Sequence, residues 1–135
     1  MRYCARIVGV IMLLAWAPAA LAQTGHEIAL RDVITRQLEA MNRGDAAAAF
    51  AIASPAIQKH FGDAPTFMGV VERSYPQVYR SRSHRFLRLD IVDDKLIQRV
   101  LIESDSGTVV ALYEMIQIDG AWRINSCTIE KRDGA

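Results

Sequence analysis

One carboxylate in an apolar stretch is the first residue of this sequence that could do chemistry. Glu114 is the only charged residue in 109–118, and in an alternating strand its same-face neighbours are apolar. Desolvation in such a place raises a carboxyl pKa towards that of a general acid or base. The same pattern also fits a structural ion pair, in which Arg99 or Arg88 neutralises Glu114 and Asn125 hydrogen-bonds it. A nearby guanidinium opposes the pKa shift that acid/base catalysis requires, so the structural ion pair is favoured and Glu114 is the catalytic candidate only as the alternative.

The other chemistry-bearing residues are dispersed. His26, His60 and His84 each lack a second ligand three or four positions away, so no metal site is expected. The basic run 80–85 fits either a site for phosphate or an acidic partner, or a solvated loop. Cys127 fits either a reactive thiol or a small buried strand residue. No phosphate-binding glycine loop or nucleophile motif is present, and no cofactor is predicted.

These residues need elements to position them, and the hydrophobic period changes along the chain. Up to about residue 75 apolar residues recur at helical spacing, and we expect helices over 26–43 and 46–53, a short turn ending at Phe61, and a third helix that Pro76 stops. Beyond Arg85 the period is two, which predicts strands at 85–92, 96–103, 109–118 and 121–130. Helices followed by a meander predict an α+β domain, with the helices on one face of a four-stranded antiparallel sheet.

Two-residue turns allow the strand pairing to be predicted. With Asp119–Gly120 and Asp93–Asp94 as turns, Glu114 faces Asn125, and Arg88 faces Arg99. Arg99 then lies directly across from Glu114 or on its diagonal. One sheet face is almost wholly apolar. The other mixes the charged residues with apolar ones, Cys127 and Ile129 included, and suits a subunit interface or a pocket with a polar end.

The first 22 residues read as an export signal. Arg2 and Arg6 precede an apolar run, and Ala20-Leu21-Ala22 is a small-x-small cleavage site. The apolar run is too short for a membrane anchor, so we expect a single mature domain over 23–135, periplasmic or secreted, without a membrane anchor. Cleavage changes the formal net charge from +1 to −1, which does not favour nucleic acid as a partner. It also removes Cys4, so no internal disulfide is expected.

The residues "QLEAMNRGDAAAAFAIASPAIQKHFG" and "DGAWRINSCTIEK" resemble the nuclear transport factor 2-like superfamily, and within it an exported bacterial branch known only as a domain of unknown function. The resemblance covers about residues 28–130. It implies a curved, cystatin-like cone. Members of this superfamily include isomerases, dehydratases, transport adaptors and dimerisation modules, so the fold does not fix the function.

The resemblance also suggests where a site would lie. Tyr75 and Tyr79 fall where the superfamily places pocket-lining aromatics, although their spacing of four also fits a core stripe. The candidate ligand-binding residues are Glu114, Arg99, Asn125, Tyr75 and Tyr79. We expect a non-catalytic module that forms a homodimer through a sheet face and binds a small apolar ligand or an envelope protein. The alternative is an isomerase or dehydratase in which Glu114 shuttles a proton and a tyrosine steadies the oxyanion.

Overall fold

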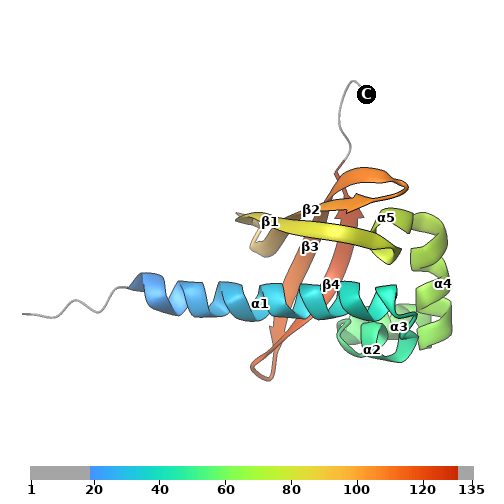
Figure 1. Ribbon diagram of the computed structural model, residues 1–135. Coiled ribbons are helices and arrows are strands. Elements are labelled where there is room, and N and C mark those ends of the chain that lie inside the picture. Colours follow the sequence, from blue (N-terminus) through green and yellow to red (C-terminus); the bar gives the residue numbers. More distant parts are fainter. Residues whose placement is uncertain (1–18, 131–135) are drawn as a thin grey trace, which may run out of the picture.

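The computed structural model describes residues 19–130, which form five helices followed by four strands (Figure 1). The helices are α1 (Ala19–Asn42), α2 (Ala46–Ala51), α3 (Pro55–Phe61), α4 (Ala64–Ser74) and α5 (Pro76–Tyr79). The strands are β1 (Ser81–Val92), β2 (Lys95–Ser104), β3 (Gly107–Ile118) and β4 (Ala121–Ile129). The predicted α+β class is confirmed, and the helices followed by a curved, open antiparallel sheet are consistent with a nuclear transport factor 2-like cone.

Local signals explain most helix ends. Gly44 adopts a φ of +69°, a left-handed value that glycine takes without strain, and it ends the first helical segment. The next three helices begin at side-chain N-caps: Asp45, Ser54 and Asp63 accept hydrogen bonds from the backbone N–H groups of Ala48, Ile57 and Thr66. α1 begins at Ala19, earlier than predicted, and so includes the last residues of the predicted export signal. The rest of that segment, 1–18, lies outside the described residues.

The strands pair in the order β1-β2-β3-β4, all antiparallel. Both predicted two-residue turns are confirmed: Val92 pairs with Lys95, and Ile118 pairs with Ala121. The turn residues Asp93, Asp94 and Asp119 have positive φ, as such tight hairpins require. β1 begins at Ser81, so most of the basic run predicted as a loop is strand, because it pairs with the end of β2.

Two bulges change the predicted faces. In β1 the register shifts between Phe86 and Leu89, so Leu87 and Arg88 share the position opposite Arg99 and the predicted regular pair of Arg88 with Arg99 does not form. In β4 the register shifts after Ile124, and Glu114 pairs with Ser126 instead of Asn125. Each bulge adds one residue to its strand and reverses the side-chain alternation beyond it. Cys127 and Ile129 therefore pack against the core, a correction to the predicted faces.

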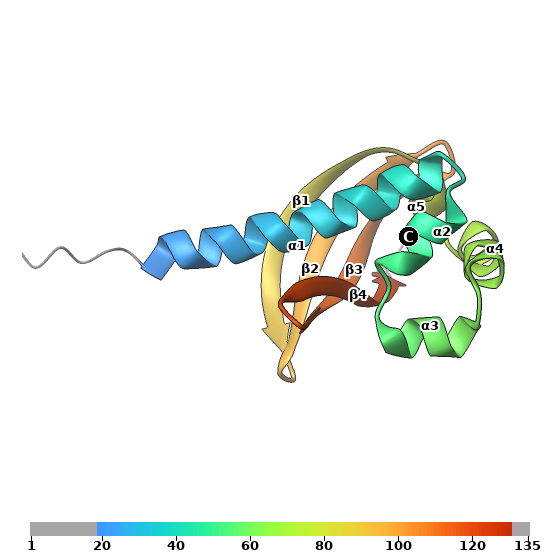
Figure 2. The same cartoon turned by 90° about the horizontal axis from the view of Figure 1, so that it is seen from below.

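The helices cover one face of the sheet, and the core lies between these layers. α1 runs along the curved sheet. The short helices α2 to α5 gather near the carboxyl-terminal end of α1 (Figure 2). Leu30, Ile34 and Leu38 of α1 are almost completely buried. They share the core with sheet residues that include Val100, Ile102 and Tyr113. The predicted apolar face of the sheet is thus the covered one, apart from the changes that the bulges make.

Candidate functional site

A cavity of about 320 Å³ lies between the helices and β4. Residues of α1, α3, α4, α5 and β4 line it, and most of the lining side chains are apolar or aromatic. They are Gln37, Met41, Ala53, Ile57, His60, Phe61, Phe67, Val70, Val71, Tyr75, Val78, Ile124, Ser126, Cys127 and Thr128. This volume falls at the lower end of the range of ~300–1,000 Å³ for small-molecule sites. The cavity is therefore the candidate functional site.

The bulged strand β4 and the chain before α3 build one wall of the cavity. The backbone N–H of Ile124 donates to the carbonyl of Ile52 over 3.1 Å, and that of Ser54 donates to the carbonyl of Ile124 over 2.8 Å. The buried Ser54 hydroxyl also donates to Asn125 Oδ1 at 2.7 Å. Asn125 is the extra residue of the bulge, so this contact fixes the point at which the alternation reverses. The reversal turns Cys127 to the cavity.

Few polar groups reach the cavity. Gln37 of α1 is only 3% exposed, and within 19–130 its side-chain amide makes no hydrogen bond. His60 and Thr128 are exposed residues and mark the solvent side of the cavity. The lining includes no aspartate, glutamate, lysine or arginine. The site is therefore largely apolar, without acidic, lysine or arginine side chains, and Gln37 is the buried polar residue among its walls.

Cys127 and Tyr113 face each other across β3 and β4. Burial raises the pKa of the Cys127 thiol to about 12, although its contact with Tyr113 opposes the rise. Burial also raises the pKa of Tyr113 well above its usual value. The Tyr113 hydroxyl is fully buried, with no regular hydrogen-bond partner among the described residues. At neutral pH both groups are uncharged, so Cys127 is a polarisable wall residue and not a reactive thiolate.

The structure does not bring the predicted site residues together. Tyr75 lines the cavity, whereas Tyr79 packs at the margin of the core with Arg80 over its ring, 5.6 Å from the centroid. Asn125 belongs to the bulge beside the cavity. Glu114 lies on the sheet face away from the helices, where Ser126 donates a hydrogen bond to it over 3.2 Å. The sheet thus separates Glu114 from Tyr75.

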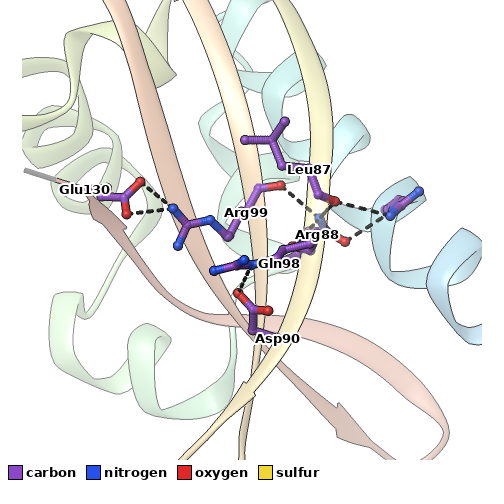
Figure 3. A network of polar contacts seen from close by, with 7 residues as sticks. Leu87, Arg88, Asp90, Gln98, Arg99 and Glu130 are labelled. Carbon is purple, nitrogen blue, oxygen red and sulfur yellow. Dashed lines mark hydrogen bonds and ion pairs between the residues drawn. The ribbon is translucent and has the colours of Figure 1, made fainter. Parts of the chain in front are cut away.

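Arg99 is the second predicted site residue on that outer face. The register places it opposite Leu112, on the diagonal from Glu114, which is one of the two predicted arrangements. The predicted ion pair with Glu114 is nevertheless wrong. Arg99 Nη2 contacts both carboxylate oxygens of Glu130 at 2.6 Å (Figure 3). Glu130 follows β4 directly, and its carboxylate raises the pKa of Arg99.

The β1 bulge is held from the core side by Gln98, which is completely buried (Figure 3). Its Nε2 donates to the carbonyls of Leu87 and Arg99 at 3.0 and 2.9 Å, and its Oε1 accepts from Arg31 at 3.2 Å. Arg88, bulged out of register, pairs with Asp90 at 2.9 Å on the exposed side. This polar network is structural, because every contact satisfies a backbone or side-chain group of the sheet.

The histidines have separate structural surroundings. His26 packs edge-on against Trp122, His60 against Phe61, and His84 Nε2 lies 3.3 Å from the hydroxyl of Thr35. Across residues 19–130 no three histidine, cysteine or acidic side chains are close enough to hold a metal ion. Metal chemistry therefore has no candidate ligand set in this part of the chain.

A second hollow lies at the other end of the sheet, beside the start of α1. His26, Leu30, Leu89, Leu96 and Trp122 are among its walls, as is Ile91, which is 77% exposed. It is an open surface hollow, and no buried polar group was found among its walls.

Sequence reasoning missed Gln37. The residue lies three positions after Ile34 and four before Met41, on the buried stripe of α1. A glutamine on an otherwise apolar stripe was a signal that could have identified it. What the sequence could not show is that the side chain reaches a cavity instead of a hydrogen-bond partner.

Comparison with known families places the chain. A family model described as "Domain of unknown function (DUF4864)" matches residues 23–135, and the chain therefore belongs to this family. Among curated proteins none matches the sequence. The family assignment agrees with the resemblance to a domain of unknown function and leaves the activity open. The cavity is therefore the feature of the molecule that bears on function.

Proposed function

We propose that this protein is a non-catalytic binding module that takes up a small, largely apolar molecule in the cavity between its helices and β4. The observation that carries the proposal is the apolar lining of a space of about 320 Å³. An engineered apolar cavity of ~150 Å³ suffices to bind benzene. Transfer of a ligand's apolar surface from water into such a space is favourable by ~25 cal/mol per Å².

The alternative, an isomerase or dehydratase that uses Glu114, has less support. A proton shuttle must lie within hydrogen-bond reach of the bound substrate. Glu114 instead lies across the sheet from Tyr75 and from the cavity. The cavity walls include no carboxylate that could replace it. These placements favour binding over proton transfer.

Butylbenzene is a suitable first probe, because it is neutral and can be compared with polar derivatives of the same length. We expect calorimetry to detect binding and the methyl resonance of Met41, a wall residue, to shift. Saturation of the site at about 100 times the dissociation constant should stabilise the protein by ~2.7 kcal/mol.

A cavity-filling variant identifies the site. Val70 lines the cavity and is only partly buried, so Val70→Phe should fill the space and abolish binding. Val92→Phe, at the exposed end of β1, is the matched control and should bind as the wild type does. Absence of butylbenzene binding to the wild type, or equal binding by both variants, would refute the proposed site.

We also propose that the outer sheet face forms a homodimer. Ile97, Leu101, Leu112 and Ile116 are only partly buried there, and charged residues of both signs surround them. Apolar residues among paired charges are typical of a two-fold interface, in which the same face meets itself. Sedimentation should show a dimer at micromolar concentration and a monomer for Leu112→Glu. A monomeric wild type would overturn this proposal.

Export remains a proposal that rests on the sequence. The family match begins at residue 23, directly after the predicted cleavage site. In the described part of the chain no helix is long and apolar enough to cross a membrane. Intact-mass analysis of protein recovered from outside the cytoplasm should show a chain that begins at Gln23. A recovered chain that retains residues 1–22 would contradict export with cleavage.

A further inference from the structure

The most informative polar group of the molecule is the Gln37 side chain. It is 3% exposed, lines the cavity, and makes no hydrogen bond within residues 19–130. Buried polar groups in native proteins are almost always hydrogen-bonded, and those that are not call for an explanation. The other buried glutamine, Gln98, follows this rule: its Nε2 donates hydrogen bonds and its Oε1 accepts one. Gln37 therefore differs from Gln98: its amide has no partner within residues 19–130 and keeps a small accessible surface, whereas the one fully buried side-chain atom there without a partner is the Tyr113 hydroxyl.

The chemistry of an amide defines its complement. A primary amide offers two N–H donors and one carbonyl acceptor from a single planar group. A partner that satisfies both ends must accept one hydrogen bond and donate another. Alcohols and amides can do this. A hydrocarbon can do neither, and an ionised carboxylate can only accept.

The remaining walls exclude a charged ligand. No lysine or arginine lines the cavity to pair with an anion, and no aspartate or glutamate lines it to pair with a cation. His60 is the one wall residue with a basic side chain, and it is exposed to solvent. A buried charge without a partner is strongly unfavourable. A charged head group would have to remain in solvent, away from Gln37.

We propose that the cavity selects a neutral amphipathic molecule, with an apolar body and one amide or alcohol head group that hydrogen-bonds to the Gln37 side chain. This inference rests on the proposed function and adds the class of ligand. Gln37 is the specificity-determining residue: the apolar walls bind the body, and the amide distinguishes a head group that both donates and accepts. Discrimination by buried hydrogen-bonding groups is strong, because an unsuitable ligand leaves them unpaired.

A matched series of ligands tests the inference. Butylbenzene, 4-phenylbutanamide and 4-phenylbutanoate share one apolar body and differ only at the end. Calorimetry at pH 8, where the acid is ionised, should show the amide binding at least about tenfold more tightly than the carboxylate.

The decisive variant is Gln37→Leu, with Gln37→Met as a second replacement of similar length. Either replacement should weaken the binding of 4-phenylbutanamide by about tenfold. The binding of butylbenzene should stay unchanged or become tighter. Thermal unfolding of the ligand-free variants should occur at the wild-type temperature or above, because no hydrogen bond is lost. Gln77→Leu, on α5 and outside the cavity, is the matched control and should change neither affinity.

The outcomes separate the two proposals. If the Gln37 variants weaken the amide no more than they weaken butylbenzene, or if the carboxylate binds the wild type as tightly as the amide, the inference is wrong and the apolar site stands. A clear loss of stability in both ligand-free Gln37 variants would also overturn it, since the side chain would then be structural. If none of the three molecules binds, the proposed function fails as well.

Discussion

Ser54 offers the sharpest test of how the cavity wall is built, because one buried hydroxyl has two roles. Its oxygen caps α3 by accepting from the backbone N–H of Ile57 at 3.2 Å, and its proton is donated to Asn125 Oδ1 at 2.7 Å. Ser54→Ala removes both contacts. Loss of an N-cap costs ~1 kcal/mol, and a buried acceptor left without its donor costs ~1 to 3 kcal/mol. Because Asn125 is only partly buried, we expect a total loss of about 2 to 3 kcal/mol.

Urea denaturation followed by circular dichroism measures this loss, and Asp45→Ala provides the control. Asp45 caps α2 through Ala48 at 3.0 Å but has no second contact across to the sheet, so its removal should cost only ~1 kcal/mol. The double variant Ser54→Ala/Asn125→Ala should be less destabilised than the sum of the single variants, by ~1 kcal/mol. Equal losses for Ser54→Ala and Asp45→Ala, together with additivity in the cycle, would refute the role of this hydroxyl in holding the bulge.

Four further expectations follow from other contacts. Tyr113→Phe removes a buried hydroxyl without a regular partner, so the free energy of unfolding should stay the same or rise, by up to ~1 kcal/mol; a large loss would contradict this assignment. Cys127, with its thiol pKa raised to about 12, should react slowly with iodoacetamide at pH 8 until urea unfolds the chain. The folded state holds the thiol proton of Cys127 more tightly than the unfolded state does. The stabilising effect of this proton should therefore be complete below the usual thiol pKa of 9.0 and decline as the pH rises towards 12. Cys127→Ala should flatten this decline of the unfolding free energy with pH, and an unchanged slope would contradict the raised pKa. A double-mutant cycle of Arg99→Ala and Glu130→Ala should give a coupling of about 1 kcal/mol, since both side chains remain partly exposed, and zero coupling would show that the pair does not form in solution.

Local patterns were enough to predict four of the five helices and the four strands in their order, but not α5, which begins at the Pro76 that was expected only to end a helix. Apolar spacing in α1 identified the helix and its buried stripe, because a helix places residues three and four apart on one side. The turns at Asp93–Asp94 and Asp119–Gly120 were predictable because short polar residues and glycine tolerate the positive φ that tight hairpins need. With two turns defined, the antiparallel order of the four strands followed from short connections.

The faces of the strand ends were decided by tertiary contacts. The bulge at Asn125 is held by Ser54, 71 residues earlier, and the bulge beside Leu87 by Gln98 and Arg31. Such contacts join residues far apart in the chain, so no local pattern shows where a strand gains a residue. One extra residue moved Cys127 from the predicted outer face to the cavity.

For the candidate site, too, the sequence predicted some features and the tertiary structure decided the others. Sequence alone identified Tyr75, which lines the cavity, and also Glu114 and Arg99, which lie on the opposite face. It determined that the chain forms a small α+β domain with one apolar sheet face, because side-chain period and turn chemistry are local properties. Only the tertiary structure decided that the helices leave a cavity on that face and that Gln37 lines it without a hydrogen bond within residues 19–130, because a cavity depends on how separate elements fit together.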